Sequence, residues 1–392
     1  MRWRKLSGRL LALLIGYALA ELLLVPVFLR FVTIRQLEYL PRAMGVMAQT
    51  SKAGTVPRDY TLILGDSFAE GQGDWADAGF ARGGRPEYST AHVLHDRSGE
   101  DVINFGVGGA NSVTALVKNP IRRGTALRRF LVGPPRRVLV YFYEGNDLDG
   151  DLRDVLRLLG PSEGLETLDG ARIDAYLADV ASRARVRGWL ENLYLAGMIG
   201  NTLQAAFGSG ERKDPRASEP PADALALDVA RIAGQSTPLA RGMNAPALEL
   251  TSAELDLALE VFERALLFCR GLYPEAEMVV VYVPSPLSCY DLEGEEVSIR
   301  SYLGRSALHP ARRVQERSRE IRARVRAIAS AARLGFVDPT DALQRLASTT
   351  PIHGPGDWGH FNEKGYRCLS EEILAGAFVA TGVPGSNGEA GR

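Results

Sequence analysis

Cysteine is scarce in this chain. Cys269, Cys289 and Cys368 are the only three among 392 residues, and their spacing is irregular. Such a set excludes a disulfide framework and a structural zinc site, which need more ligands at regular intervals. An oxidising compartment would allow one pair to bridge, and the sequence does not identify which pair. The fold must therefore be held by an ordinary hydrophobic core, for which 46% hydrophobic residues are ample.

Net charge is almost absent as well. The 46 basic and 47 acidic residues leave a formal charge of −1 at pH 7, which argues against nucleic acid as a partner. Gly106 and Gly108 begin a dinucleotide-binding pattern, but Asn111 stands where the third glycine belongs. A metal site made of His353, Asp357 and His360 is a minor alternative, because the spacing is irregular and a fourth ligand is missing. We expect no cofactor and no metal.

One long apolar run lies near the amino terminus. Residues 10–29 contain a single charged side chain, Glu21, and a helix of that length measures about 30 Å, the thickness of a hydrocarbon core. Small residues at positions 18–20 also fit a signal-peptide cleavage site, but the apolar run continues past them, which favours an uncleaved anchor. Basic residues precede the run. This asymmetry predicts a single-pass membrane protein with a cytoplasmic amino terminus and an extracytoplasmic body, either periplasmic or at the cell surface.

The remaining sequence alternates between strand and helix patterns. We divide the chain into an amino-terminal tip and anchor (1–32), a connector (33–59), one catalytic domain (60–380) and a flexible tail (381–392). Apolar runs predict five strands, at residues 61–64, 101–105, 137–143, 277–283 and 335–337. Helical segments separate the strands, and Thr251 with Glu254 forms a capping box before one of them. The pattern is typical of an α/β protein with a doubly wound parallel sheet.

An insertion interrupts this alternation between the third and fourth strands. Residues 148–250 are too many for an ordinary crossover. Their first part has a helical, apolar pattern, and residues 208–223 are polar and proline-containing, as in a linker. We expect a helical insertion that caps the carboxyl ends of the strands. The alternative is a satellite that packs elsewhere for stability.

A candidate nucleophile follows the first predicted strand. The apolar run ends in Gly65-Asp66-Ser67, which predicts a sharp turn from a buried strand into a helix. In open α/β sheets, ligands bind at the carboxyl ends of the strands, so Ser67 would present its hydroxyl and backbone N–H to that crevice. Taken alone, Gly-Asp-Ser favours the simpler interpretation, a polar turn that caps the next helix.

Three further polar stretches supply what a serine nucleophile needs. Acyl transfer requires a base, a carboxylate that orients it, and donors for the oxyanion. His360 can be the base, and Asp357, three residues earlier, can orient it. The oxyanion donors would be the backbone N–H groups of Ser67 and Gly109 and the side-chain amide of Asn146. All these stretches follow predicted strands or precede a helix, so we expect them to converge.

Together these blocks resemble the SGNH (GDSL-type) hydrolase superfamily. The resemblance covers about residues 60–143 and 277–380 and depends on four blocks in this order: Gly65-Asp66-Ser67, Gly109, Gly145-Asn146-Asp147 and Asp357-x-x-His360. It implies a flavodoxin-like three-layer α/β/α fold with a five-stranded parallel sheet and metal-independent ester hydrolysis. It also implies a triad of Ser67, Asp357 and His360 and an oxyanion hole of Ser67, Gly109 and Asn146. One departure is Glu144, where the family often has glycine.

Three functional hypotheses follow. The first is a membrane-anchored extracytoplasmic serine esterase that hydrolyses carboxylic esters, acetyl esters among them, through an acyl-enzyme. The second is an O-acyltransferase that passes the acyl group to a surface or exported polysaccharide, with the insertion excluding water. The third is a noncatalytic glycan-binding or assembly protein that has kept the fold. The expected partners are an ester-bearing small molecule or acylated glycan, and the membrane through residues 10–29.

Overall fold

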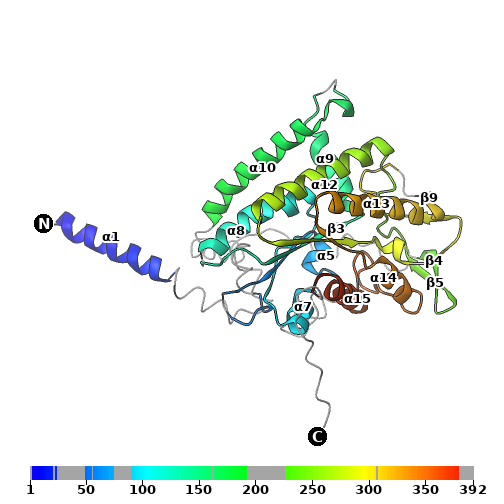
Figure 1. Ribbon diagram of the computed structural model, residues 1–392, viewed down its shortest axis with the longest axis horizontal. Helices are drawn as coiled ribbons and strands as arrows, with labels where there is room; N and C mark the ends of the chain where they lie inside the picture. The colour runs from blue at the N-terminus through cyan, green and yellow to red at the C-terminus, as the bar shows by residue number, and fades with distance from the viewer. Residues whose placement is uncertain are drawn as a thin grey trace, which may run out of the picture.

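The computed structural model describes residues 2–20, 23, 49–54, 56–74, 90–129, 131–160, 163–191, 226–305 and 308–378 (Figure 1). Its centre is a five-stranded sheet in which every neighbouring pair is parallel. The strands are β1 (Thr61–Leu64), β2 (Val102–Asn104), β3 (Arg137–Tyr143), β6 (Glu277–Val283) and β10 (Gly335–Val337). These are the five strands predicted from the sequence, so the α/β class and the five-stranded parallel sheet are confirmed.

The strand order explains where a ligand site can form. Across the sheet the order is β10-β6-β3-β1-β2, which is the flavodoxin-like order of doubly wound sheets. The chain winds one way from β1 to β2 and the other way from β3 onward, so β1 and β3 flank the switch point. Loops leaving these two strands diverge, and the space between their carboxyl ends is open to side chains from both.

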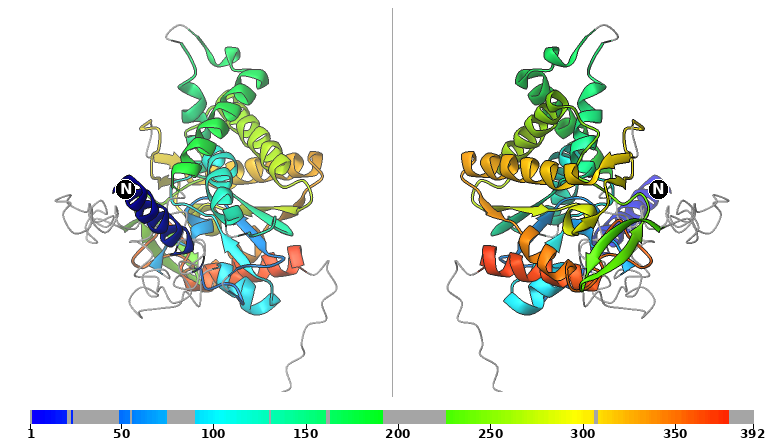
Figure 2. Two further views of the ribbon diagram at one scale, coloured as in Figure 1. Left: turned by 90° about the vertical axis from the view of Figure 1, so that its left-hand side faces the viewer. Right: turned by 90° about the vertical axis from the view of Figure 1, so that its right-hand side faces the viewer.

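Helices cover both faces of the sheet (Figures 1 and 2). Alternate residues of β3 face opposite layers, Val138 and Val140 toward one core and Leu139 and Tyr141 toward the other. The first layer contains α8 (Asn119–Arg129), α9 (Asn146–Leu156), α12 (Ser252–Leu272) and most of α13 (Ala311–Ala331). The second contains α5 (Ser67–Glu70), α7 (Thr90–Ser98), α14 (Thr340–Ala347) and α15 (Glu363–Ile373). The result is a three-layer α/β/α arrangement.

The predicted capping box at the start of α12 is present. The Thr251 hydroxyl accepts from the Glu254 N–H, and the Glu254 carboxylate accepts from the Thr251 N–H. The helix buries one apolar stripe against the sheet, formed by Leu255, Leu259, Phe262, Leu266 and Cys269. Short helical turns complete the described elements: η2 (Thr114–Lys118), η3 (Leu165–Thr167), η6 (Pro286–Cys289) and η7 (Leu374–Phe378).

Within the insertion at residues 148–250, residues 192–225 lie outside the described residues, and the prediction of a helical insertion was wrong for residues 226–240, which form strands joined by a turn. After α10 (Gly170–Glu191), the chain forms a hairpin of β4 (Ala226–Ile232) and β5 (Gln235–Ala240). Ala233 and Gly234 have φ of 51° and 76°, as in the two-residue turns that match the twist of a hairpin. The hairpin pairs with β7 (Leu292–Glu293), next to a second small sheet of β8 (Glu296–Ser298) and β9 (Leu308–Pro310).

The described helix of the insertion does not lie over the carboxyl ends of the strands. Buried residues of α10, such as Ile173 and Leu177, join the core that α8 and α12 form on one face of the sheet. Figure 1 shows α10 running alongside these two helices. For α10, this arrangement corresponds to the alternative of a satellite rather than to a cap. The linker predicted at residues 208–223 lies outside the described residues.

At the amino terminus, α1 (Arg2–Leu19) carries exposed apolar side chains, including Leu11, Leu13 and Leu14. Among the helices that the structure describes, none combines the length and apolar character needed to cross a membrane. Of the predicted span at residues 10–29, only 10–20 and 23 are described. Most of the predicted connector and the entire tail at 381–392 also lie outside the described residues. All three cysteines are free, with Cys269 and Cys289 buried.

Candidate active site

The turn that carries Ser67 requires a glycine before it. A Cβ on Gly65 would lie 2.7 Å from the Cβ atoms of both Ala69 and Tyr141, closer than such atoms approach. Only glycine therefore lets α5 pack this closely against β3. Asp66 caps α5 by accepting the N–H of Phe68 at 3.0 Å. Ser67 is the first residue of α5, 7% exposed, at the carboxyl end of β1.

Ser67, His360 and Asp357 form a continuous hydrogen-bonded row. The distance from Ser67 Oγ to His360 Nε2 is 2.8 Å, and His360 Nδ1 lies 2.6 Å from Asp357 Oδ2. When Nδ1 carries the proton and donates it to the carboxylate, Nε2 is free to accept from the serine hydroxyl. The structure thus brings these three predicted residues together, with the expected atoms facing one another.

Close backbone packing holds His360 beside Ser67. A Cβ on Gly73, just after α5, would lie 2.6 Å from the Phe361 carbonyl oxygen and 3.3 Å from the His360 Cβ. The Tyr366 hydroxyl donates to the Gln72 carbonyl at 2.6 Å, which ties α15 to the same segment. The histidine loop and the serine loop therefore contact each other directly, although 293 residues separate the two reactive side chains.

The environment keeps Asp357 ionised. Burial opposes its negative charge, but the hydrogen bond from His360, the positive charge that His360 can carry and the Gly359 N–H outweigh it, so the pKa of Asp357 lies below its usual value. Asp66 behaves differently. Burial raises its pKa to about 6, although the Phe68 N–H and His360 favour its charged form. Asp66 Oδ2 lies 3.4 Å from Ser67 Oγ, so this carboxyl braces the turn beside the nucleophile.

The loop that carries Gly109 is fastened to the nucleophile helix. Asn104 Nδ2 donates to the Ala69 carbonyl at 2.5 Å, and the Gly108 N–H donates to Glu70 Oε2 at 2.6 Å. Gly109 has φ of 69°, in the left-handed region that favours glycine. A Cβ built there would meet nothing within 4 Å, so the space next to Gly109 is open. These contacts place Gly109 in a loop that packs on the helix starting at Ser67.

Asn146 is the first residue of α9, immediately after β3. It is partly exposed, whereas its neighbour Asp147 is buried and accepts the Tyr143 N–H at 3.0 Å. That bond closes the turn between strand and helix. Because β3 pairs with β1, Asn146 and Ser67 leave adjacent strands at the same edge of the sheet. The three predicted oxyanion residues thus follow β1, β2 and β3.

Near the site, the burial of one residue and a contact of another were not evident from the sequence pattern. The Glu144 side chain is completely buried, so the departure from glycine does not put an open carboxylate beside Asn146. Asn244, from the insertion, donates through Nδ2 to the Gly359 carbonyl at 3.4 Å, next to His360. No local motif marks Asn244, because its partner lies 115 residues away along the chain.

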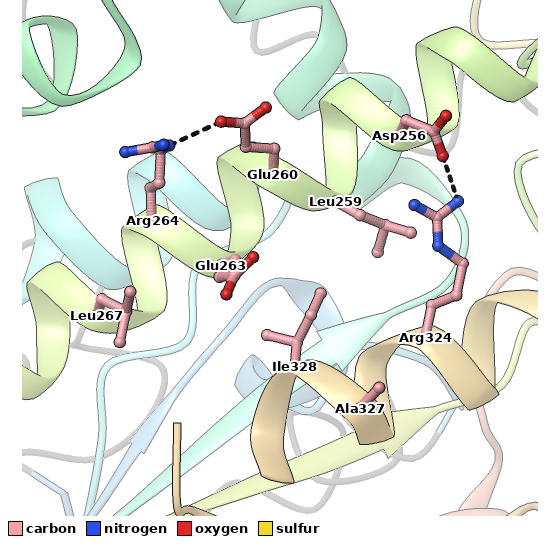
Figure 3. A pocket seen from close by; sticks show the side chains of 9 residues that line it. All are labelled: Asp256, Leu259, Glu260, Glu263, Arg264, Leu267, Arg324, Ala327 and Ile328. Carbon is pink, nitrogen blue, oxygen red and sulfur yellow. Dashed lines mark hydrogen bonds and ion pairs between the residues drawn. The ribbon is translucent and has the colours of Figure 1, made fainter. Parts of the chain in front are cut away.

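A groove elsewhere on the molecule lies between α12 and α13 (Figure 3). Its charged side chains face one another: Arg324 pairs with Asp256 at 2.7 Å, and Arg264 pairs with Glu260 at 3.0 Å. We assign it no role. Among the described residues no group of three or more His, Cys, Asp or Glu side chains could hold a metal ion. His353 is buried and bonds to the Tyr290 hydroxyl, and burial lowers its pKa to about 3.

Comparisons with known proteins give limited similarity. No protein-family model matches the chain, and no curated protein matches it. An extracellular lipase from Streptomyces rimosus is 15% identical over 81% of this chain and 99% of its own, with a TM-score of 0.38. A member of the lipolytic protein G-D-S-L family from Veillonella parvula is 11% identical over 82% and 98%, with a TM-score of 0.32. An alpha/beta hydrolase from the metagenome of Lake Arreo, Spain, is 11% identical over 81% and 94%, with a TM-score of 0.32. At these levels, none of the similarities assigns a function.

Proposed function

We propose that this protein is a serine hydrolase that cleaves carboxylic esters through an acyl-enzyme. The observation that carries the proposal is the hydrogen-bonded row from Ser67 through His360 to Asp357, with separations of 2.8 and 2.6 Å. Each member sits where acyl transfer needs it: a hydroxyl at the end of a strand, an imidazole that can take its proton, and a carboxylate that fixes the tautomer.

In the first half-reaction, Ser67 Oγ attacks the ester carbonyl carbon while its proton passes to His360 Nε2. The carbonyl oxygen becomes an oxyanion that the N–H groups of Ser67 and Gly109 and the amide of Asn146 stabilise. The tetrahedral intermediate collapses with cleavage of the bond to the alcohol oxygen. His360 protonates that oxygen, so the alcohol leaves and the acyl group stays on Ser67.

In the second half-reaction, water takes the place of the alcohol. His360 removes a proton from the water as its oxygen attacks the acyl carbon, and the new intermediate collapses to a carboxylic acid. The proton returns from His360 to Ser67 Oγ, which restores the free enzyme. Asp357 accepts the His360 Nδ1 proton in a hydrogen bond throughout and stabilises the imidazolium that forms twice in each cycle.

The proposal also places the catalytic domain outside the cytoplasm, attached to the membrane by residues 10–29. Its support is the length of the apolar run, the basic residues before it and the exposed apolar side chains of α1. Cell fractionation tests it: the full chain should need detergent for extraction, and a variant without residues 10–29 should not. Recovery of the full chain in the aqueous fraction without detergent contradicts the anchor.

Covalent labelling tests the catalytic assignment. A fluorophosphonate probe should modify the wild-type protein, and the modified peptide should contain Ser67. Ser67→Ala should abolish labelling and hydrolysis of a simple aryl acetate. Ser370→Ala is the matched control, because it also removes a buried serine hydroxyl but lies on α15 and bonds only within its helix. Labelling of Ser67→Ala equal to that of wild type would reject the proposal.

A further inference from the structure

Glu144 is a fully buried carboxylate two residues before Asn146. Its Oε1 accepts the Ser285 N–H at 2.7 Å and the Ser288 hydroxyl at 2.5 Å, and its Oε2 accepts the Tyr282 hydroxyl. A buried carboxylate is tolerated only with such donors around it, and its hydrogen bonds are stronger than those between neutral groups. Glu144 therefore joins the end of β3 firmly to η6, the turn that follows β6.

The turn η6 is joined in its own right to Asn244. The Leu287 N–H, in the middle of η6, donates to the Asn244 carbonyl at 3.2 Å. Asn244 is 5% exposed and belongs to the segment after β5, in the insertion. The same turn that Glu144 holds on one side therefore fixes the Asn244 backbone on the other.

The Asn244 side chain then reaches the loop of the catalytic base. Its Oδ1 accepts the Tyr302 hydroxyl at 2.8 Å, which orients the amide, and its Nδ2 donates to the Gly359 carbonyl at 3.4 Å. The Gly359 N–H in turn donates to Asp357 Oδ1 at 2.7 Å. Gly359 thus lies between Asn244 and both members of the Asp357–His360 pair.

We propose that Glu144 and Asn244 are positioning residues that form, through η6, one brace between the loop of Asn146 and the loop of His360. The inference rests on the proposed function for its catalytic consequence. The oxyanion donor and the base sit on different loops, and transition-state stabilisation requires both to stay in place relative to Ser67. A displacement of about 1 Å can lower the rate about 100-fold, so a rigid link between the loops has a kinetic effect.

Two truncations test the brace. Glu144→Ala and Asn244→Ala should each lower kcat for an aryl ester about 10- to 100-fold and change KM less than about threefold. Glu144→Gln is the conservative rescue. Its amide oxygen can still accept from Ser285 and Ser288, and Tyr282 can donate instead to the Ser318 carbonyl at 3.2 Å. This variant should therefore keep kcat within about tenfold of wild type.

The matched control is Glu100→Ala, at the opposite end of the sheet. Glu100 also holds a network together, since it accepts from Arg137 at 3.1 Å and from the Thr61 hydroxyl at 3.0 Å. Its loss should lower the unfolding temperature but leave kcat per folded molecule unchanged. If Glu100→Ala lowers kcat as much as Glu144→Ala does, general loss of stability explains the effect and the brace is overturned.

A double variant distinguishes one brace from two separate supports. When either end of a single link is already broken, breaking the other end removes little more. Glu144→Ala/Asn244→Ala should therefore have a kcat within about threefold of the weaker single variant. Losses that multiply would overturn the proposal.

A spectroscopic measurement decides the brace even when catalysis is absent. The proton shared between His360 Nδ1 and Asp357 should give a low-field resonance in histidine-labelled wild type, assigned by its disappearance in His360→Gln. Glu144→Ala and Asn244→Ala should shift or broaden this resonance, and Glu100→Ala should not. An unchanged resonance in both brace variants overturns the proposal. If the wild-type protein shows this resonance but neither reacts with the fluorophosphonate probe nor hydrolyses the ester, the proposed function fails. The resonance still tests the brace in that case.

Discussion

The two ends of the central sheet use buried charge in opposite ways. At the amino ends of the strands, Arg137 is completely buried, and its Nε and Nη1 donate to Glu277 at 3.0 Å and to Glu100 at 3.1 Å. Its guanidinium also lies 4.2 Å from the ring centroid of Phe378. At the carboxyl ends, carboxyl groups such as Asp66 and Asp149 are buried, and burial raises their pKa.

This difference separates structural from reactive use of polar groups. Charges at the amino ends have fixed partners, and removing one partner would leave the other charge unpaired and lower stability. At the carboxyl ends the pairing of charged groups is less complete. Ser67, His360 and Asp357 keep exposure and hydrogen-bonding capacity available for a substrate, and the buried carboxyls beside them lower stability at neutral pH. A change at one end should therefore affect activity, and a change at the other should affect stability.

The largest loss of activity should come from removing His360, the proposed general base. His360→Ala should lower ester hydrolysis about 10⁴-fold, because His360 Nε2 is the nearer acceptor for the Ser67 proton, at 2.8 Å, whereas Asp66 Oδ2 lies 3.4 Å from Ser67 Oγ. Steady-state kinetics with an aryl acetate measures the loss. His95→Ala, a change of another partly buried histidine on α7, should leave kcat unchanged. If His360→Ala is as active as wild type, the carboxyl ends of the strands are not the catalytic end of the sheet.

The pH dependence of stability should show that buried carboxyl groups at the carboxyl ends of the strands destabilise the folded protein at neutral pH. Burial raises the pKa of Asp149 to about 7, from about 4 in an unfolded chain, with Glu249 adding to the shift. Between pH 4 and pH 7 the unfolded chain has released this proton while the folded chain still binds it, so stability falls as the pH rises. Asp149→Asn should remove a decline on the order of 4 kcal/mol. Urea unfolding of both proteins at pH 4, 5.5, 7 and 8 measures it, and parallel curves would contradict the prediction.

Removing one oxyanion donor should lower kcat less than removing the base does. Asn146→Ala removes one donor and should lower kcat about 100-fold with little change in KM, because the donor acts on charge that develops in the transition state. Kinetics with the same ester measures the change, and fluorophosphonate labelling of Ser67 should slow in parallel. Asn119→Ala is a control for loss of an asparagine at the first residue of a helix, here α8. A variant that raised KM alone would place Asn146 in ground-state binding.

The smallest effect should come from the amino ends of the strands. Arg137→Met keeps an unbranched side chain but removes two charge-assisted hydrogen bonds, so it should lower the free energy of unfolding by about 2 kcal/mol. Its kcat per folded molecule should equal that of wild type. Urea unfolding and kinetics on the same preparation test both statements. A loss of kcat without a loss of stability would show that the two ends are coupled after all.

Much of this architecture follows from short-range sequence patterns. The strands β3, β6 and β10 match the runs from which they were predicted. After their charged first residues, β3 and β6 are buried and apolar, as a strand covered on both faces requires. Ser67, Asp357 and His360 could be selected because each stands at the end of such an element or in a recognisable block. Their mutual distances then follow from the parallel topology, which brings the carboxyl ends of all five strands to one edge.

Other parts depend on contacts that no local pattern encodes. Asn244 reaches Gly359 only because the insertion folds back onto the sheet, and nothing around Asn244 in the sequence distinguishes it. Glu144 stood out as a departure from glycine, but its burial depends on donors from η6, more than 130 residues later. The hairpin of β4 and β5 was detectable in principle. Ala233 and Gly234 separate two segments in which apolar and polar residues alternate. The helical pattern earlier in the insertion led instead to the prediction of a helical insertion.

The distance along the chain between Ser67 and His360 also bears on how the protein is made. A nascent polypeptide exposes the Ser67 hydroxyl early, but the His360 imidazole stands 293 positions later in the chain and is synthesised correspondingly late. Shortened products that end before the histidine loop would therefore carry the proposed nucleophile without its proposed base, and we expect no ester hydrolysis from them.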